Sequence, residues 1–224
     1  VDIFFVISGF VMMLSTANNT NKFFLKRAIR IIPLYWLVTF GVFFIAILFP
    51  HLLRSTDTNL IYLLKSLFFI PFDKNGISHQ PVVAVGWTLN FEMYFYFLFW
   101  LACFINKSLR GVVNVSFLIF IILIMNQFDG ILPQIYSNII ILEFALGICL
   151  FYLINKNYYC VLFVASLIIL SSYLNFNINH RFFIFGIPSL IIVWISIILG
   201  KYLPKSSYYV MLGSISYPLY LIHA

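Results

Sequence analysis

The amino-acid sequence predicts an all-α protein, built as a bundle of helices that cross a membrane. Its mean hydropathy is +1.06, and 63% of its residues are hydrophobic. Only 8% are charged, whereas soluble domains carry about 25% charged residues. A chain with so few charges cannot cover a water-facing surface. Its apolar stretches have the length needed to cross a hydrocarbon core of about 30 Å.

Eight apolar segments are predicted to be membrane spans. They cover residues 1–17, 33–50, 86–105, 112–127, 136–154, 158–175, 182–200 and 207–224. A ninth segment, residues 59–71, is shorter and contains Lys65. Its length favours an interfacial or re-entrant piece over a full span. If it did cross the membrane, the direction of every span before it would be reversed.

Basic residues are distributed unevenly between the two sets of connectors that alternating spans would separate. One side would hold nine of them: Lys22, Lys26, Arg27, Arg30, Lys107, Arg110, Lys156, Lys201 and Lys205. The other would hold Arg54, Lys65, Lys74 and Arg181, with Asp57, Asp73 and Asp129. The positive-inside rule places the first set in the cytoplasm. We therefore interpret the net charge of +7 as loop bias, and it predicts no nucleic-acid partner.

This orientation places the rare acidic groups in the outer half of the membrane. At a rise of 1.5 Å per residue, Glu92 and Glu143 would lie about 9 Å and about 10 Å below the outer boundary, with Asp2 near the outer face. Arg27 and Arg30 would lie at the inner face. A charge at the centre of a span costs about 2.5–3.5 kcal/mol on insertion scales, and carboxyls inside spans usually line a site or a path. A functional explanation of Glu92 is therefore favoured over packing.

Two spacing patterns allow both a functional and a structural interpretation. Arg27 and Arg30 are three residues apart, a geometry suited to bidentate capture of phosphate groups. Juxtamembrane arginines also set topology or contact anionic lipids. Ser216, Tyr220 and His223 share one helix face, where they would either belong to a site or hydrogen-bond neighbouring helices.

The three cysteines predict neither a disulfide nor a metal site. Cys103, Cys149 and Cys160 lie in or beside apolar segments, and their spacings of 46 and 11 residues match no metal motif. We interpret them as packing residues and predict no bound metal.

The chain resembles the membrane-bound acyltransferase-3 family, which includes the O-acetyltransferases of bacterial surface polysaccharides. The resemblance rests on four ordered stretches, "VDIFFVISGFVMM", "KRAIRIIPLYW", "GWTLNFEMYFYF" and "GSISYPLYLIH", and on the patch "LEFALG". It implies a bundle of about ten transmembrane helices in the bacterial inner membrane. It also implies transfer of an acetyl group from cytoplasmic acetyl-CoA to a hydroxyl of a lipid-linked or exported glycan. Acetyl-CoA would be a substrate, and no bound cofactor is implied.

The resemblance also implies roles for individual residues. Arg27 and Arg30 match the family's Arg-x-x-Arg motif and are expected to bind or handle the donor. Trp87 and Glu92 match its Trp…Glu motif near the reaction path and are the catalytic candidates. The other motif or pocket candidates are Asp2, Glu143, Ser216, Tyr217, Tyr220 and His223.

The family's proposed catalytic histidine lies on the first transmembrane helix, upstream of the segment that begins at Val1. His51, His79 and His180 lie in predicted loops and do not match that position. We therefore expect residues 1–224 to be a single membrane domain, truncated at the N-terminus and at the C-terminus, that is inactive alone. An upstream helix of about 20 residues carrying the histidine would cover Asp2, which would otherwise be exposed to lipid.

The main alternative from another functional class is a transporter or flippase of a glycan or lipid intermediate. Intramembrane acids and an inner arginine pair also suit a permeation path. Inverted repeats would favour transport, and the sequence shows no clear internal repeat. A second alternative is an acyltransferase that acts on a small exported molecule or on peptidoglycan. The sequence does not distinguish between these acceptors.

Overall fold

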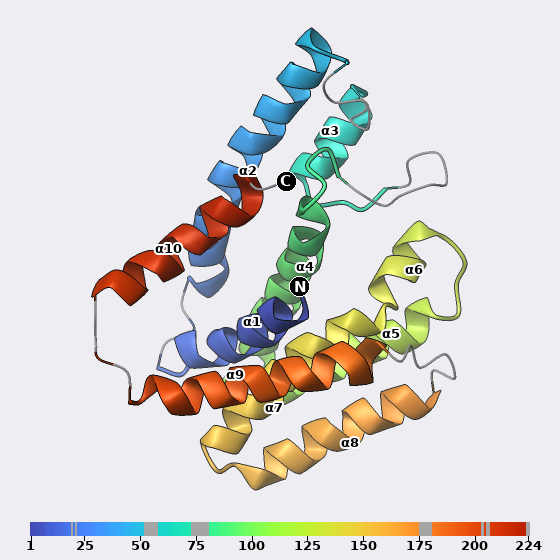
Figure 1. The fold of residues 1–224 in the computed structure, drawn as a ribbon. Coiled ribbons are helices and arrows are strands. Elements are labelled where there is room, and N and C mark those ends of the chain that lie inside the picture. Colours follow the sequence, from blue (N-terminus) through green and yellow to red (C-terminus); the bar gives the residue numbers. More distant parts are fainter. Residues whose placement is uncertain are drawn as a thin grey trace. The chain divides into compact units, whose positions relative to one another are not determined.

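The structure, a computed structural model, describes most of the chain as helices (Figure 1). The described residues are 1–18, 20, 22–51, 58–72, 81–174, 181–202, 204 and 207–222. For residues 170–174, 207–210, 212, 214, 216 and 222 the description covers the backbone alone. Within these ranges there is no β-strand, which agrees with the predicted all-α class.

The chain divides into two compact units, and each is described by itself. The first unit comprises Val1–Phe24 and Tyr94–Leu203, and the second comprises Leu25–Met93 and Pro204–Ala224. The helices of the first unit are α1 (Asp2–Ser15), α5 (Arg110–Met125), α6 (Ile131–Tyr136), η1 (Ile139–Ile141), α7 (Leu142–Ile154), α8 (Tyr158–Leu174), the π-helix η2 (Phe182–Gly186) and α9 (Ile187–Gly200). Those of the second unit are α2 (Phe23–Leu48), α3 (Leu60–Leu67) and α10 (Ser207–Ile222), although Phe23 and Phe24 belong to the first. The helix α4 (Gly86–Ile105) is divided between the two, because the second unit ends at Met93 and the first resumes at Tyr94.

In the first unit, α1 packs mainly against α7, where two glycines bring the backbones into contact. A Cβ atom on Gly9 would lie 2.1 Å from the Phe144 carbonyl oxygen, and one on Gly147 would lie 2.1 Å from the Val6 carbonyl oxygen. Small residues allow this close approach between helices in membranes. Beside the glycines, the Phe5 and Phe144 rings lie 4.7 Å apart.

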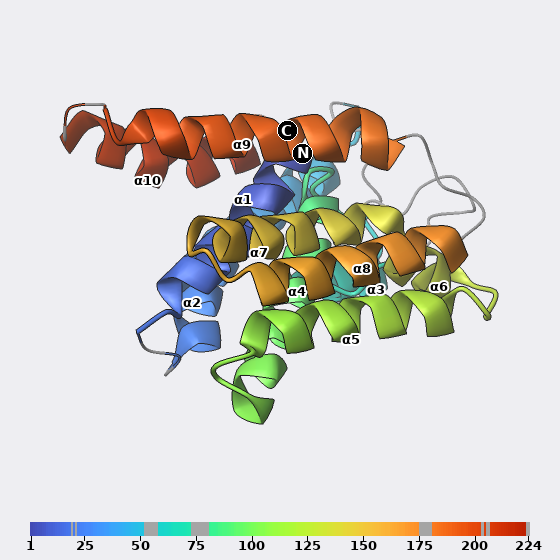
Figure 2. The ribbon, with the colours of Figure 1, turned by 90° about the horizontal axis from the view of Figure 1, so that it is seen from below.

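The helix α8 lies against both α5 and α7, as Figure 2 shows. Its partner α7 is buried on nearly every side, since the residues from Leu142 to Ile148 are all buried. The apolar pattern around this helix therefore has no polar face, as expected for a helix surrounded by protein.

The contacts of α1 and α7 show that these two helices run in the same direction. Asp2, near the start of α1, interacts with Glu143 at the start of α7. Further along the same two helices, the Phe10 and Phe151 rings lie 6.1 Å apart between centroids. Alternating spans predict a common direction for the first and fifth segments, and these contacts agree with it.

Arg110 corrects the interpretation of one basic connector. Arg110 was counted among the basic residues of the cytoplasmic connectors, yet it is buried at the start of α5. Its guanidinium group donates to Thr16 Oγ1 at 2.9 Å, to the Met13 carbonyl at 3.2 Å and to the Lys107 carbonyl at 2.7 Å. The carbonyls at the end of a helix have no partner within it, so Arg110 closes the C-terminal end of α1.

In the second unit, α2 packs against α3 and the segment that follows it. The Trp36 indole N–H donates to the Leu67 carbonyl at 2.9 Å, and the Tyr35 ring stacks on Phe69 with centroids 4.9 Å apart. The helix α3 has eight residues, or about 12 Å. This is less than half of the hydrocarbon core and favours the predicted non-spanning piece at residues 59–71.

The predicted segments match helices, with differences at two places. The helix α2 begins at Phe23 and contains Pro33, whereas the segment was predicted to start at residue 33. The predicted segment 136–154 is preceded by α6 and interrupted at Asn138, whose side chain accepts from the Ile140 N–H and caps η1. Among the described residues, three helices are long and apolar enough to cross a membrane, Phe23–Leu48, Gly86–Ile105 and Phe182–Gly200. The other apolar helices are shorter, so a count of eight spans stays a prediction.

Substituting either interface glycine is expected to destabilise the protein. In Gly9→Ala or Gly147→Ala, the new methyl group would meet a backbone oxygen, which no rotamer change can relieve. The helices must then separate, and overpacking of this kind costs about 1–3 kcal/mol. Thermal unfolding in detergent should show a lower midpoint for both variants.

The matched control is Gly41→Ala, since a Cβ at Gly41 would meet no atom within 4 Å. Alanine is favoured over glycine inside a helix by about 1 kcal/mol, so this variant should unfold at the same or a higher temperature. Equal midpoints for Gly9→Ala and Gly41→Ala would show that the close contact is not needed.

Candidate functional site

The second unit carries the two arginines of the predicted donor site on α2. Arg27 is half-buried and Arg30 is exposed, both within the first two turns of the helix. Arg27, Ile31, Tyr35 and Thr39 follow one another at intervals of four residues and so share one face. Since Ile31, Tyr35 and Thr39 are buried, Arg27 begins the buried face of α2, while Arg30 lies beside it and is exposed.

Glu92 is buried in α4, with 4% of its surface exposed. It interacts electrostatically with Arg27, and also with Tyr217 and Tyr220 of α10. The Tyr217 side chain interacts with Arg30 as well. The structure therefore brings five predicted site residues into one cluster, the α2–α4–α10 cluster: Arg27, Arg30, Glu92, Tyr217 and Tyr220.

Arg27 and Glu92 interact, although the sequence analysis placed Glu92 in the outer half of the membrane and both arginines at the inner face. The helix α2 begins at Phe23, so both arginines lie inside the helix rather than in a connector. At 1.5 Å per residue, Arg30 lies about 10 Å into the helix.

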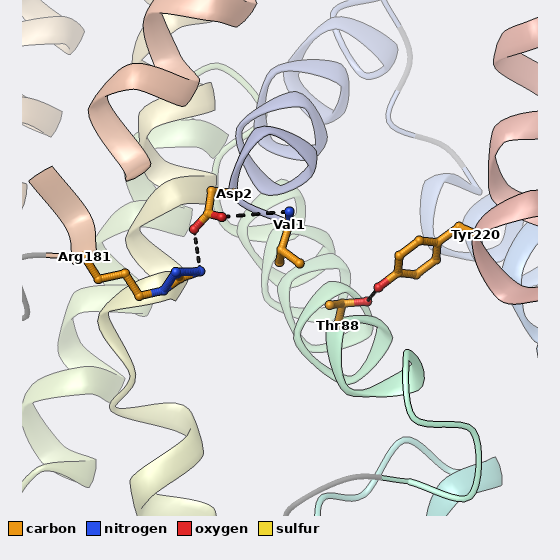
Figure 3. A network of polar contacts seen from close by, with 5 residues as sticks. All are labelled: Val1, Asp2, Thr88, Arg181 and Tyr220. Carbon is orange, nitrogen blue, oxygen red and sulfur yellow. Dashed lines mark hydrogen bonds and ion pairs between the residues drawn. The ribbon is translucent and has the colours of Figure 1, made fainter. Parts of the chain in front are cut away.

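Two tyrosines connect α10 with the helices that carry the charged groups. The Tyr217 hydroxyl donates to the Ile31 carbonyl of α2 at 3.0 Å. The Tyr220 hydroxyl lies 2.7 Å from Thr88 Oγ1 of α4, as Figure 3 shows. Thr88 was not predicted to be a site residue. It is buried, and its position four residues before Glu92, on the same helix face, was the available signal.

Trp87, the second catalytic candidate, packs against an aromatic neighbour. It is half-buried at the start of α4, and its ring lies edge-on to Phe91 with centroids 6.0 Å apart. The structure thus places Trp87 in the aromatic packing of α4, next to Thr88. This packing alone assigns Trp87 no chemical role.

A second polar cluster lies in the first unit and contains Asp2, Glu143 and Arg181. Arg181 forms an ion pair with Asp2, drawn in Figure 3, and the carboxyl groups of Asp2 and Glu143 interact electrostatically. The expectation that Asp2 would be exposed to lipid is therefore wrong, because Arg181 covers it and its side chain is only 16% exposed. Arg181 was assigned to a loop, and no sequence pattern indicated its partner.

Several predicted residues lie outside the described part of the chain. They are His79, His180, His223 and the side chain of Ser216. His51 is described and exposed, with its ring 6.2 Å from that of Phe49. Within the described ranges, no group of three or more His, Cys, Asp or Glu side chains could hold a metal ion.

Comparisons with known proteins identify the family of the chain. The profile of the acyltransferase domain family Acyl_transf_3 matches residues 1–224. The chain is 40% identical, over 156 residues, to the exopolysaccharide production protein ExoZ of Rhizobium meliloti (strain 1021), which covers 66% of this chain and 48% of the relative. It thus spans about half the length of the curated relative that it matches. No solved structure matches. Because the family profile covers every residue, the chain belongs to the acyltransferase-3 family.

Proposed function

We propose that the protein is a membrane-bound O-acyltransferase that moves an acetyl group from cytoplasmic acetyl-CoA to a hydroxyl of a lipid-linked or exported glycan. Family membership supports acyl transfer, and the name of the R. meliloti relative, an exopolysaccharide production protein, supports a polysaccharide acceptor. The observation that carries the proposal is the buried Glu92, which interacts electrostatically with Arg27, the half-buried arginine of the donor motif.

The arginine pair suits the phosphate groups of the donor. A guanidinium group binds phosphate through two parallel N–H donors, which a lysine cannot reproduce. Arg30 is exposed and Arg27 half-buried. They can therefore bind a ligand that arrives from water near the N-terminal end of α2. Arg27 also interacts electrostatically with the buried Glu92.

Glu92 suits the acceptor side of the reaction. In the transfer, the acceptor oxygen forms a bond to the acetyl carbon, the bond from that carbon to sulfur breaks, and the hydroxyl proton ends on the departing CoA thiolate. A base must take the proton first. By resemblance this base is a histidine upstream of Val1, and a carboxylate can orient either that histidine or the acceptor hydroxyl. Exclusion of water around a buried acid also protects the thioester from hydrolysis.

The membrane arrangement that we propose has eight spans in this chain, with the start of α5 in the cytoplasm and its end outside. The helix α5 has 16 residues, or about 24 Å, so labelling at its two ends is a sharp test of crossing. In a variant without Cys103, Cys149 and Cys160, Lys107→Cys should be shielded from an impermeant thiol reagent in intact cells. Asp129→Cys should react. The opposite labelling would reverse the orientation, and reaction at both sites would remove α5 from the spans.

Glu92→Gln should lower turnover by about 10²–10⁴-fold, the usual contribution of a group in acid–base chemistry. The amide keeps the shape of the side chain, so the yield of folded protein should hold. The measurement is acetyl transfer from labelled acetyl-CoA to glycan acceptors by the full-length protein.

Asp129→Asn, the matched control, makes the same chemical change at an exposed position and should leave turnover unchanged. An active but poorly folded Glu92→Gln protein would make Glu92 a packing residue. Movement of the glycan across the membrane without acetylation would favour a transporter.

Arg30→Lys should raise the KM for acetyl-CoA by about tenfold, because it loses a bidentate charged hydrogen bond. Its thermal stability should hold, since Arg30 is exposed. Arg110→Lys provides the contrast, because Arg110 bonds three acceptors within the fold. That variant should lose stability and keep its KM. An unchanged KM in both Arg27→Lys and Arg30→Lys would limit the pair to setting topology.

A further inference from the structure

We propose that Tyr217 and Tyr220 are positioning residues, which join α10 to both α2 and α4 and thereby fix Glu92 relative to Arg27 and Arg30. This inference rests on the proposed acyl transfer and assigns a separate kinetic role to each tyrosine. Both side chains are half-buried, and both interact electrostatically with Glu92.

Tyr217 bonds α2 at the turn that carries the arginines. Its hydroxyl donates to the carbonyl of Ile31 at 3.0 Å, and Ile31 directly follows Arg30. Pro33 lies two residues further along the same helix. Proline has no N–H, so the carbonyl of Ile29, four residues before Pro33, lacks its helical donor. The Tyr217 bond therefore ties α10 to α2 in the turn whose own backbone bonding is incomplete.

Tyr220 bonds α4 one turn before Glu92. Its hydroxyl lies 2.7 Å from Thr88 Oγ1, and both hydroxyls reach the Val85 carbonyl, at 3.3 Å from Tyr220 and 3.0 Å from Thr88. Each hydroxyl carries one proton. One hydroxyl can therefore donate to the other while the second donates to Val85, which satisfies all three groups at the start of α4.

The spacing of the two tyrosines allows both bonds from one side of α10. Positions 217 and 220 are three residues apart and therefore neighbours on one helix surface. One hydroxyl reaches α2 and the other reaches α4, so a shift of α10 moves both. The sequence pattern of Ser216, Tyr220 and His223 does not contain Tyr217, and its contact with α2 depends on the packing of separate helices.

The different partners predict different kinetic effects. Loss of the Tyr217 bond loosens the helix that carries the donor arginines, and loss of the Tyr220 bond loosens the helix that carries Glu92. A small displacement of a reacting group reduces rate strongly, by about 10²-fold for 1 Å. Each contact is a single hydrogen bond, so its removal should affect folding much less than rate.

The test is steady-state kinetics of the full-length protein, with acetyl-CoA and a glycan acceptor varied separately. Tyr217→Phe should raise the KM for acetyl-CoA by about five- to tenfold with little change in kcat, and Tyr220→Phe should lower kcat by about tenfold. Thr88→Val should reproduce the effect of Tyr220→Phe. The double variant Tyr220→Phe/Thr88→Val should lower kcat no more than either single substitution, because both remove the same bond between the two hydroxyls. Tyr159→Phe, at an 88% exposed tyrosine, is the matched control and should leave both constants unchanged.

Four results would count against the inference. Tyrosine variants with less folded protein but unchanged kcat and KM would make both residues packing contacts. Additive losses in the double variant would separate Tyr220 from Thr88. A wild-type protein that transfers no acetyl group to any glycan acceptor would overturn the proposed function, and this inference with it. Unchanged kinetics in an active protein would overturn this inference alone.

Discussion

The backbone contact of Gly9 with α7 is the constraint on which the first unit depends. A hydrocarbon surrounding provides no hydrophobic force between helices, so close packing and internal polar bonds must hold them. The two glycines remove the side chains that would keep α1 and α7 apart. The polar groups at the ends of α1 then come within reach of partners. Asp2 meets Arg181 at one end, and Arg110 bonds the last carbonyls at the other.

The second unit is held in a different way, by polar side chains rather than by glycines. Tyrosine hydroxyls of α10 bond a carbonyl of α2 and a hydroxyl of α4. Such bonds contribute about 0.6 kcal/mol each in membranes, so they define the arrangement more than they stabilise it. A helix docked through two weak and directional bonds suits a site in which the position of Glu92 matters.

Sequence periodicity and hydropathy were sufficient to predict the helices, because the formation of each helix depends on the residues within its own segment. The start of α2 was missed since Pro33 is tolerated inside the helix. The cluster residue Thr88 could have been found from its spacing to Glu92. The partners of Asp2, Arg110 and Tyr217 could not, because each contact joins segments far apart in the chain and depends on how the helices pack.

The acids Asp2, Glu143 and Glu92, which were predicted to lie in the membrane, differ in what their surroundings leave for a ligand. Asp2 and Glu143 share one cluster with Arg181, which forms an ion pair with Asp2. Glu92 instead interacts with Arg27, which is only half-buried and lies three residues before the exposed Arg30. An arginine pair with one exposed member can bind an incoming anion and still interact with the acid. A ligand phosphate at the arginines would therefore change the field at Glu92, which couples donor binding to the group that we expect to act on the acceptor.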